Sequence, residues 1–331
     1  MKFFTEVNID TYPEKIEHYN SIFTIGSCFA ENIGNKFTEL KFNSMINPFG
    51  VLYNSASIKN SLRLLAEQKI FSEDDLIFNQ DEWHSFYHHS DFSHHKKETI
   101  ISKINSTSAS AFSFLSKTDW LVISLGTSFV YHHNQSGTIV SNCHKIPQKE
   151  FTKSFLTLEE NYSNIKEIIE QQLSLNSNTK FLLTISPVRH FKDGAHNNQL
   201  SKASLLLAIN KIVNEFVKAY YFPSYEIMMD ELRDYRYYDV DLLHPNTQAI
   251  NYIWEKFSDS LLTKQCQLIN EEIQKIVTAA NHRVRNIHSQ KNIDFAKNML
   301  ARIKEIESSN SLINFEKEKH LFSSYINGSE R

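Results

Sequence analysis

Glycine is scarce in this sequence, with only seven residues among 331. Because glycine is favoured at tight turns and where the backbone closely approaches another group, each of the seven is informative. Three of them, Gly26, Gly50 and Gly126, follow short apolar runs. We expect these three glycines to mark the points where strands end.

Cysteine is rarer still, represented only by Cys28, Cys143 and Cys266. Three thiols cannot all pair within one chain, and none forms a CxxC motif, which argues against a disulfide scaffold and a structural zinc site. Free thiols fit a reducing compartment, so we expect the protein to be cytoplasmic. The first eight residues contain no sustained apolar stretch, so no secretion signal is expected.

The sequence also lacks a charge excess and a long apolar run. The formal net charge is -3 at pH 7, so no basic excess points to nucleic acid or to an anionic membrane. No apolar run approaches the length of a transmembrane helix. The hydrophobic content of 41% is sufficient for a packed core, and 331 residues suit one large α/β domain, alone or with an appendage.

Short apolar runs alternate with stretches of helical periodicity, such as 158–175. The runs predicted as strands, the last of them weaker, are 22–25, 45–50, 120–125, 181–185 and 225–229. This alternation predicts a mostly parallel sheet with helices on both faces. Residues 80–95 and 142–145 are predicted as loops.

The pattern changes near residue 262, after which it is helical and charged. We therefore predict an α/β domain over 1–261 and a C-terminal α-helical extension over 262–331 that packs on or beside it. In parallel sheets, function gathers at the carboxyl ends of the strands. The segments expected at that edge are 26–28, Gly50, 126–128, 186–187 and the loop at Asp241.

Ser27 and Cys28 stand at a predicted strand-to-helix turn. The free N–H groups and dipole of a helix N-terminus favour a thiolate and stabilise an oxyanion. The alternative is that Cys28 is a small buried apolar residue, as many free cysteines are. We favour a nucleophile, because the Gly26 turn and a distant Asp-x-x-His accompany it.

Asp241 and His244 form that Asp-x-x-His, followed by Pro245. In a turn, this spacing allows the carboxylate to reach the Nδ1–H of the imidazole, which fixes the tautomer and directs Nε2 to a nucleophile. The alternative is that Asp241 caps a helix and His244 lies on its surface. We favour the catalytic pair because it follows the last predicted strand.

The segment IGSCFA at residues 25–30 resembles the signature of the GSCFA-domain family of bacterial proteins. Further segments resemble this family, at 47–54, 83–90, 125–127, 142–145 and 186–190. They span most of residues 20–250. The family in turn resembles the SGNH/GDSL hydrolase superfamily, whose members are mostly esterases, lipases and carbohydrate O-acetyl esterases.

This resemblance implies an α/β fold of the flavodoxin-like, three-layer α/β/α type with a five-stranded, mostly parallel sheet. Aligning the glycine of the superfamily's Gly-Asp-Ser block with Gly26 places Cys28 on the nucleophile. Asp241 and His244 match the Asp-x-x-His block. A shift of one residue would instead make Ser27 the nucleophile; we favour Cys28.

The resemblance also implies oxyanion donors. Gly50 matches the glycine of the second block, and Gly126 the glycine of the third block, Gly-x-Asn. Ser128 replaces the asparagine of that block, and loss of such a donor costs about 10²–10³ in rate. Ser128, Asn47 or Asn142 is expected to supply the hydrogen bond instead.

Histidines crowd residues 84–95, and His84 and His88 are four apart, as in helical zinc sites. No Asp, Glu or Cys stands at a matching spacing and the segment is predicted as a loop, so we expect no metal and no cofactor. Neutral histidines and aromatic rings around a cation instead suit a sugar or an anionic acyl donor. The predicted substrate-binding residues are Trp83, His84, His88, His89, Asn142, His144, Arg189 and His190.

We therefore expect an acyl ester hydrolase or acyltransferase with a Cys(or Ser)–His–Asp site, acting on a small-molecule or carbohydrate-linked acyl ester. An alternative is a ligand-binding module with weakened chemistry on the same fold. A third hypothesis is a structural partner built around the C-terminal helices. The sequence leaves the oligomeric state open.

Overall fold

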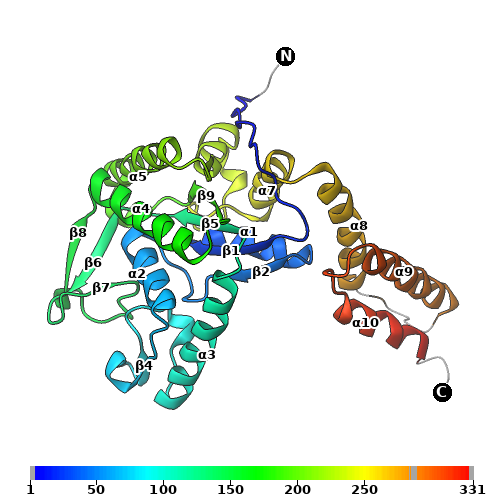
Figure 1. The fold of residues 1–331 in the computed structure, drawn as a ribbon, viewed down its shortest axis with the longest axis horizontal. Coiled ribbons are helices and arrows are strands. Elements are labelled where there is room, and N and C mark those ends of the chain that lie inside the picture. Colours follow the sequence, from blue (N-terminus) through cyan, green and yellow to red (C-terminus); the bar gives the residue numbers. More distant parts are fainter. Residues whose placement is uncertain (1–3, 283, 285–288, 328–331) are drawn as a thin grey trace.

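A computed structural model describes residues 4–282, 284 and 289–327. At its centre is a five-stranded sheet with the order β10-β9-β5-β1-β2, in which all neighbouring strands are parallel (Figure 1). Its strands are β1 (Ser21–Gly26), β2 (Asn43–Ile46), β5 (Trp120–Leu125), β9 (Lys180–Ile185) and β10 (Ala219–Phe222). This is the flavodoxin-like strand order, so the predicted fold class is confirmed.

Helices cover both faces of this sheet. They are α1 (Cys28–Glu39), α2 (Ser55–Ala66), α3 (Lys97–Leu115), α4 (Leu158–Leu175), α5 (Ala195–Glu215) and α7 (Thr247–Leu261). Side chains alternate along a strand, so Ile22 and Trp120 pack with α1 and α7 on one face. Phe23 and Leu121 pack with α2 to α5 on the other. The central strands β1 and β5 are buried along their whole length, which explains their continuous apolar sequences.

The prediction of a strand at 225–229 is wrong. The fifth strand is β10, and Pro223 separates it from a short α6 (Ser224–Glu226) and a π-helical turn at Ile227–Glu231. Ile227 and Met228 are fully buried in this helical segment. A short apolar run reports burial but does not by itself distinguish strand from helix.

Three short strands between β5 and α4 were not predicted. β6 (Phe129–His133) pairs antiparallel with β7 (Ile139–Val140) and with β8 (Phe151–Phe155). The region predicted as a histidine-rich loop also contains a hairpin of β3 (Ile77–Asn79) and β4 (Glu82–His84). Most residues of these strands are partly buried or exposed, so their sequences lack the apolar runs that mark the main sheet.

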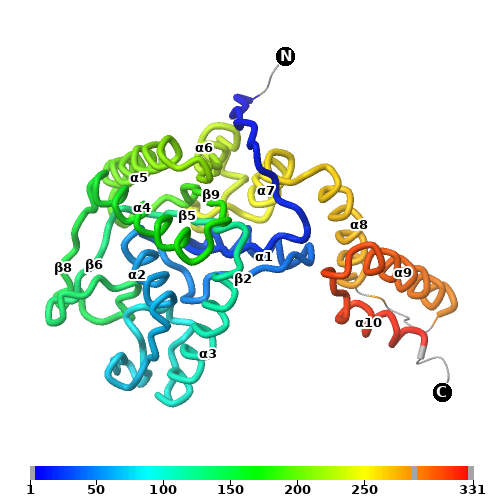
Figure 2. The backbone as a smooth tube through the Cα atoms, viewed as in Figure 1, coloured from blue at the N-terminus to red at the C-terminus, as the bar shows by residue number. Residues whose placement is uncertain are grey.

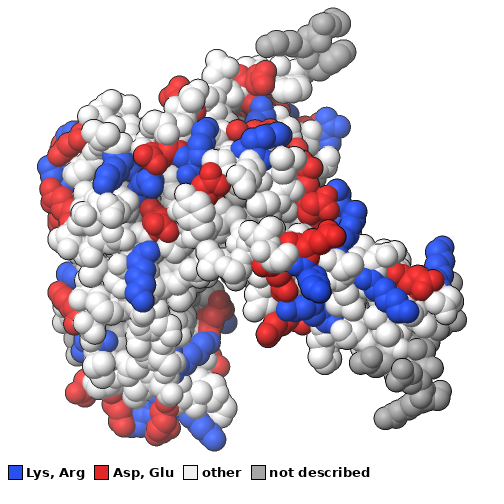
Figure 3. Space-filling model, turned by 45° about the vertical axis from the view of Figure 1, so that its right-hand side comes forward, with Lys and Arg blue, Asp and Glu red and all other residues white. Residues whose placement is uncertain are grey.

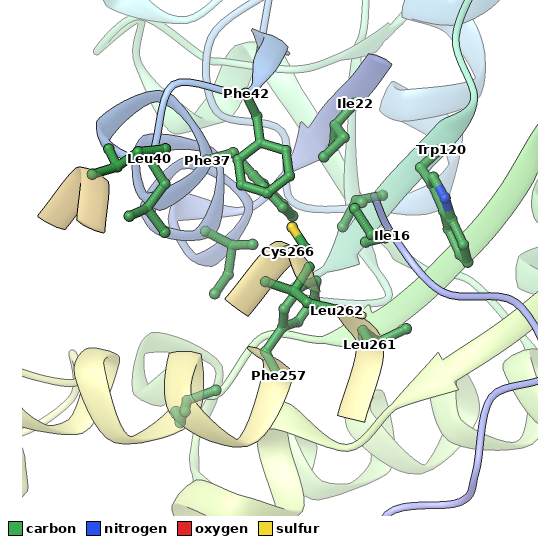
Figure 4. Close-up of a cluster of buried hydrophobic side chains, with 14 of the residues drawn as sticks. Ile16, Ile22, Phe37, Leu40, Phe42, Trp120, Phe257, Leu261, Leu262 and Cys266 are labelled. Carbon is green, nitrogen blue, oxygen red and sulfur yellow. The ribbon is translucent and has the colours of Figure 1, made fainter. Parts of the chain in front are cut away.

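The C-terminal residues form α8 (Lys264–Asn281), α9 (Gln290–Ser309) and α10 (Glu316–Asn327), which confirms the predicted helical character. These helices gather to one side of the α/β body (Figures 1 and 2). The first turn of α8 is anchored in the core, where Cys266 lies among Phe37, Ile16 and Leu262 (Figure 4). Burial raises the pKa of the Cys266 thiol to about 12, so this cysteine acts as an apolar core residue.

Charged side chains of both signs are interspersed over the face visible in Figure 3. Across the described residues, no helix is both long and apolar enough to cross a membrane.

Candidate active site

The turn after β1 is fixed by Gly26. Its φ is +132°, and a Cβ at this position would lie 2.1 Å from the carbonyl oxygen of Ser124 on β5. Only glycine fits this close approach in this conformation. The Gly26 N–H donates to Oδ1 of Asn47 at 2.9 Å, which ties the turn to the segment that follows β2.

Ser27 is the N-cap of α1 and is 1% exposed. Its Oγ lies 2.8 Å from Oγ of Ser124 and accepts the N–H of Phe29 at 3.2 Å. The hydroxyl is therefore occupied in starting the helix and joining it to β5.

Cys28 is the first residue of α1 and is partly exposed. Burial and the nearby Glu31 raise the pKa of its thiol. The N–H groups of Cys28 and Phe29 and the ammonium of Lys202 oppose this rise. The thiol therefore lies at the N-terminus of a helix, whose N–H groups partly offset the burial that disfavours the thiolate.

Asp241 and His244 are in direct contact, with Oδ2 of Asp241 2.5 Å from Nδ1 of His244. The other carboxylate oxygen of Asp241 accepts the N–H groups of Leu243 and His244, each at 2.9 Å. The N–H of His244, then its side chain, then the N–H of Leu243 lower the pKa of Asp241 to about 2. Asn246, not Asp241, caps α7, so the alternative in which Asp241 caps that helix is wrong.

Among the described residues, no hydrogen bond joins Sγ of Cys28 to His244, and the two side chains of the Asp241–His244 pair are 43% and 50% exposed. His190 lies against Gly126 and Tyr53. A Cβ built on Gly126 would be 3.1 Å from its Nε2, and its ring packs edge-on against Tyr53 at 5.4 Å. Burial, then the charge of Lys202, lower the pKa of His190 to about 4, and His244 contributes in the same direction.

Four of the oxyanion candidates differ in whether their hydrogen-bond donors are already used within the protein. The N–H of Gly50 donates to Asn47 O at 2.7 Å, and the N–H of Gly126 donates to Tyr53 O at 2.8 Å. Ser128 is fully buried, with its amide and hydroxyl both bonded to Ser201. Asn47 is different, because its Nδ2 is buried and has no hydrogen-bond partner among the described residues.

The predicted histidine cluster packs inward. His84, His88 and His144 are 6%, 1% and 5% exposed, and the rings of His84 and His144 stack at 4.6 Å. His88 stacks on Phe49 at 4.5 Å, which seats the 84–94 segment on the loop after β2. Burial lowers the pKa of His88 to about 3 and that of His144 to about 4.

Three further predicted residues surround this cluster. Trp83 contacts Phe78 on the β3–β4 hairpin, with ring centroids 5.0 Å apart. His89 is partly buried, 3.0 Å from the carboxylate of Asp91. The Oδ1 of Asn142 accepts the N–H of His144 at 2.9 Å. Among the described residues, no group of three or more His, Cys, Asp or Glu side chains is arranged to hold a metal ion.

A cavity of about 350 Å³ adjoins the Asp241–His244 loop. Its wall includes Arg189, Tyr238, Leu242 and Leu243. Arg189 lies over the ring of Phe191 at 4.7 Å, and its Nε is buried without a partner among the described residues. A larger cavity of about 1510 Å³ lies between α7, α8 and α9, and none of the predicted site residues lines it.

Sequence reasoning missed Lys202. This lysine is 2% exposed on α5 and donates from Nζ to Ser186 O at 2.8 Å. The signal was present, because Lys202 falls on the buried stripe of α5 with Leu205 and Ile209. A charged residue on the apolar face of a helix is rarely buried without a specific reason.

The comparisons with known proteins agree with the architecture. Residues 21–257 match the GSCFA family, and residues 273–328 match the GSCFA domain protein, C-terminal domain. No curated protein matches the chain. Since the first of these matches covers most of the sequence, the chain belongs to the GSCFA family.

Proposed function

We propose that the protein is an acyl ester hydrolase or acyltransferase in which Cys28 is the nucleophile, His244 the general base and Asp241 the residue that orients it. The observation that carries this proposal is the Asp241–His244 contact of 2.5 Å in a chain whose β1–α1 turn presents a partly exposed thiol. The engagement of Ser27 in capping supports Cys28 as the attacking group.

In the proposed reaction, Nε2 of His244 accepts the thiol proton as the sulfur attacks the acyl carbon. The alcohol leaves with that proton, and a thioester on Cys28 remains. Water attacks the thioester in hydrolysis, and a second alcohol attacks it in transfer. His244 accepts the proton of the attacking group and returns it to the sulfur, which restores the thiol.

The oxyanion formed in each step requires donors that the folded chain has not already used. The N–H of Cys28 at the start of α1 and Nδ2 of Asn47 meet this requirement best. The reactive state also requires His244 to come within hydrogen-bond distance of Cys28, because apo geometry is often looser than that of the reacting complex.

For the substrate, we propose a small or carbohydrate-linked acyl ester held by Arg189 and His190 beside the cavity at the Asp241–His244 loop. The unpartnered Nε of Arg189 suits a hydrogen-bond acceptor or an anionic group on the acyl donor. We place this reaction in the reducing cytoplasm, which the three free cysteines support.

The test is turnover of 4-nitrophenyl acetate by the full chain and by Cys28→Ala and His244→Gln variants. We expect both variants to lose at least about 10²-fold in kcat/KM. Wild-type turnover no faster than that of both folded variants would contradict the proposal.

One observation favours a second candidate function, a ligand-binding module. His244 has no hydrogen bond to Cys28, and the amides of Gly50 and Gly126 are already bonded. Iodoacetamide labelling separates the two candidates: in an enzyme the labelling rate of Cys28 falls in His244→Gln, whereas in a binding module it does not depend on His244.

A further inference from the structure

Lys202 is among the largest fully buried side chains of the described structure. Its Nζ donates to Ser186 O at 2.8 Å and lies 5.3 Å from the ring centre of Tyr225. Among the described residues, no carboxylate lies within ion-pair distance of it. Burying an ammonium without an acidic partner is unfavourable in free energy. A nearby negative charge from another group would stabilise the charged form of this lysine.

Cys28 lies at the same end of the sheet as this ammonium. The N–H of Ser27 donates to Ser124 O at 2.9 Å, and the N–H of Ser186 donates to Leu125 O at 2.8 Å. Cys28 and Ser186 therefore follow strands on opposite sides of β5, at the same end of the sheet. Because Lys202 is bonded to Ser186, its ammonium is at this end too.

The electrostatics agree with this placement in both directions. The ammonium of Lys202 lowers the pKa of the Cys28 thiol, and the thiolate of Cys28 raises the pKa of Lys202. Burial is the larger influence on both groups: it raises the pKa of the Cys28 thiol and lowers the pKa of Lys202 to about 7.

The other charged or titratable groups facing this pair come from four segments. Glu31 on α1 raises the pKa of Cys28, and Tyr53 follows β2. Arg189 lowers the pKa of Lys202, and His190 follows on the same segment after β9. Tyr225 on α6 packs its ring against the ammonium. Among these groups only Glu31 is a carboxylate, and its negative charge disfavours the thiolate of Cys28.

We propose that Lys202 favours the thiolate of Cys28 against the burial that opposes it, as a positioning residue that acts through charge and does not contact the acyl group. The assignment rests on the proposed function in taking Cys28 as the reactive thiol. In this assignment His244 remains the base, and Lys202, whose Nζ is bonded to Ser186 O, acts only through its charge. The thiol proton leaves to His244 or to water, and the ammonium stays behind as the partner of the thiolate.

The test measures the rate of Cys28 alkylation by iodoacetamide against pH, with peptide mapping to separate Cys28 from Cys143 and Cys266. In Lys202→Met we expect the pH midpoint of the alkylation rate to rise by about one pH unit, which lowers the rate near neutral pH about tenfold. Lys211→Met is the matched control, because Lys211 is on the same helix but is exposed and paired with Glu159. It should keep the wild-type midpoint.

A merely structural Lys202 predicts the opposite pattern, in which Lys202→Met unfolds at a lower temperature but keeps the midpoint. That result in a folded variant would overturn the proposal. If Lys202→Met does not fold, the Lys202 ammonium is titrated by NMR in Cys28→Ser. We expect its pKa to fall below the wild-type value, and an unchanged pKa would refute the assignment.

Alkylation needs no ester turnover, so the two proposals can fail separately. Absent hydrolysis with a shifted midpoint would remove the proposed function and retain the Lys202–Cys28 pair. Normal hydrolysis with an unshifted midpoint would remove only the role of Lys202.

Discussion

The carboxylate of Asp241 holds the imidazole of His244 through an Oδ2–Nδ1 contact of 2.5 Å, and the same carboxylate accepts the backbone N–H of His244. This double attachment fixes both the position and the tautomer of the ring. It leaves Nε2 as the nitrogen available to a nucleophile.

Replacing Asp241 with Asn should keep the loop but present the wrong hydrogen-bonding group to Nδ1. We expect kcat for ester hydrolysis to fall by about 10²–10⁴ with a smaller change in KM. Asp239→Asn is the control, because its Oδ1 bonds only the N–H of Val240 and no histidine side chain. Equal losses in the two variants would show that the effect comes from the loop and not from the pair.

Asn47→Asp tests the oxyanion donor with almost no change of shape. The substitution keeps an oxygen for the Gly26 N–H but replaces the unpartnered Nδ2 with a second acceptor. We expect kcat to fall by about 10²–10³. Thermal unfolding checks that the fold survives; full activity in the folded variant would exclude Asn47 as a donor.

Gly26→Ala should be strongly destabilising, because the added methyl group would meet Ser124 O at 2.1 Å in a residue with φ +132°. We expect a loss of at least about 3 kcal/mol in the free energy of unfolding. Gly137 also has a positive φ, but a Cβ there would meet no atom within 4 Å. Gly137→Ala therefore introduces backbone strain without a steric clash. Urea unfolding should show a smaller loss of stability in Gly137→Ala than in Gly26→Ala, and the difference measures the clash.

Stability should fall with acid because buried histidines must take up protons on unfolding. Burial lowers the pKa of His88 to about 3 and those of His144 and His190 to about 4, against 6.5 for an ordinary histidine. The unfolded chain then binds more protons between pH 6.5 and 4. Stability is therefore complete above pH 6.5 and falls below it, by up to about 1.4 kcal/mol per pH unit for each histidine.

Urea unfolding at several pH values measures this slope. His88→Phe keeps an aromatic ring against Phe49 and should make the acid slope shallower. The same substitution at exposed His196 should leave the slope as it is in the wild type. A slope that does not respond to His88→Phe would contradict the assignment of the proton uptake to this residue.

The three central strands of the main sheet, β1, β5 and β9, could be predicted from the sequence because they are buried runs of apolar residues. The β6–β8 sheet could not, because its strands are short and largely half-exposed. The segment 225–229 was wrongly predicted as a strand because Ile227 and Met228 are as buried in a helical turn as they would be in a strand. At this segment the apolar sequence indicated burial correctly but did not indicate the backbone conformation.

The candidate site was also only partly predictable from the sequence. Local motifs gave the Gly26–Cys28 turn and the contact between Asp241 and His244, because both depend on residues close in sequence. The environment of the sulfur did not follow from the sequence, since Lys202, whose charge lowers the thiol pKa, is on a helix far from Cys28 along the chain. The burial of His88 also did not follow from the sequence, because its ring stacks on Phe49, which is distant in the sequence.

The central claim is tested most directly by trapping the acyl-enzyme and locating the acyl group. The protein is mixed with 4-nitrophenyl acetate, quenched in acid and mapped by peptide mass spectrometry. The account predicts an acetyl group on Cys28 that is absent in Cys28→Ala and retained in Ser27→Ala, whose main loss is about 1 kcal/mol of stability from the missing helix cap. An acetyl group on Ser27, or one on Cys28 that forms as fast in His244→Gln as in the wild type, would contradict it.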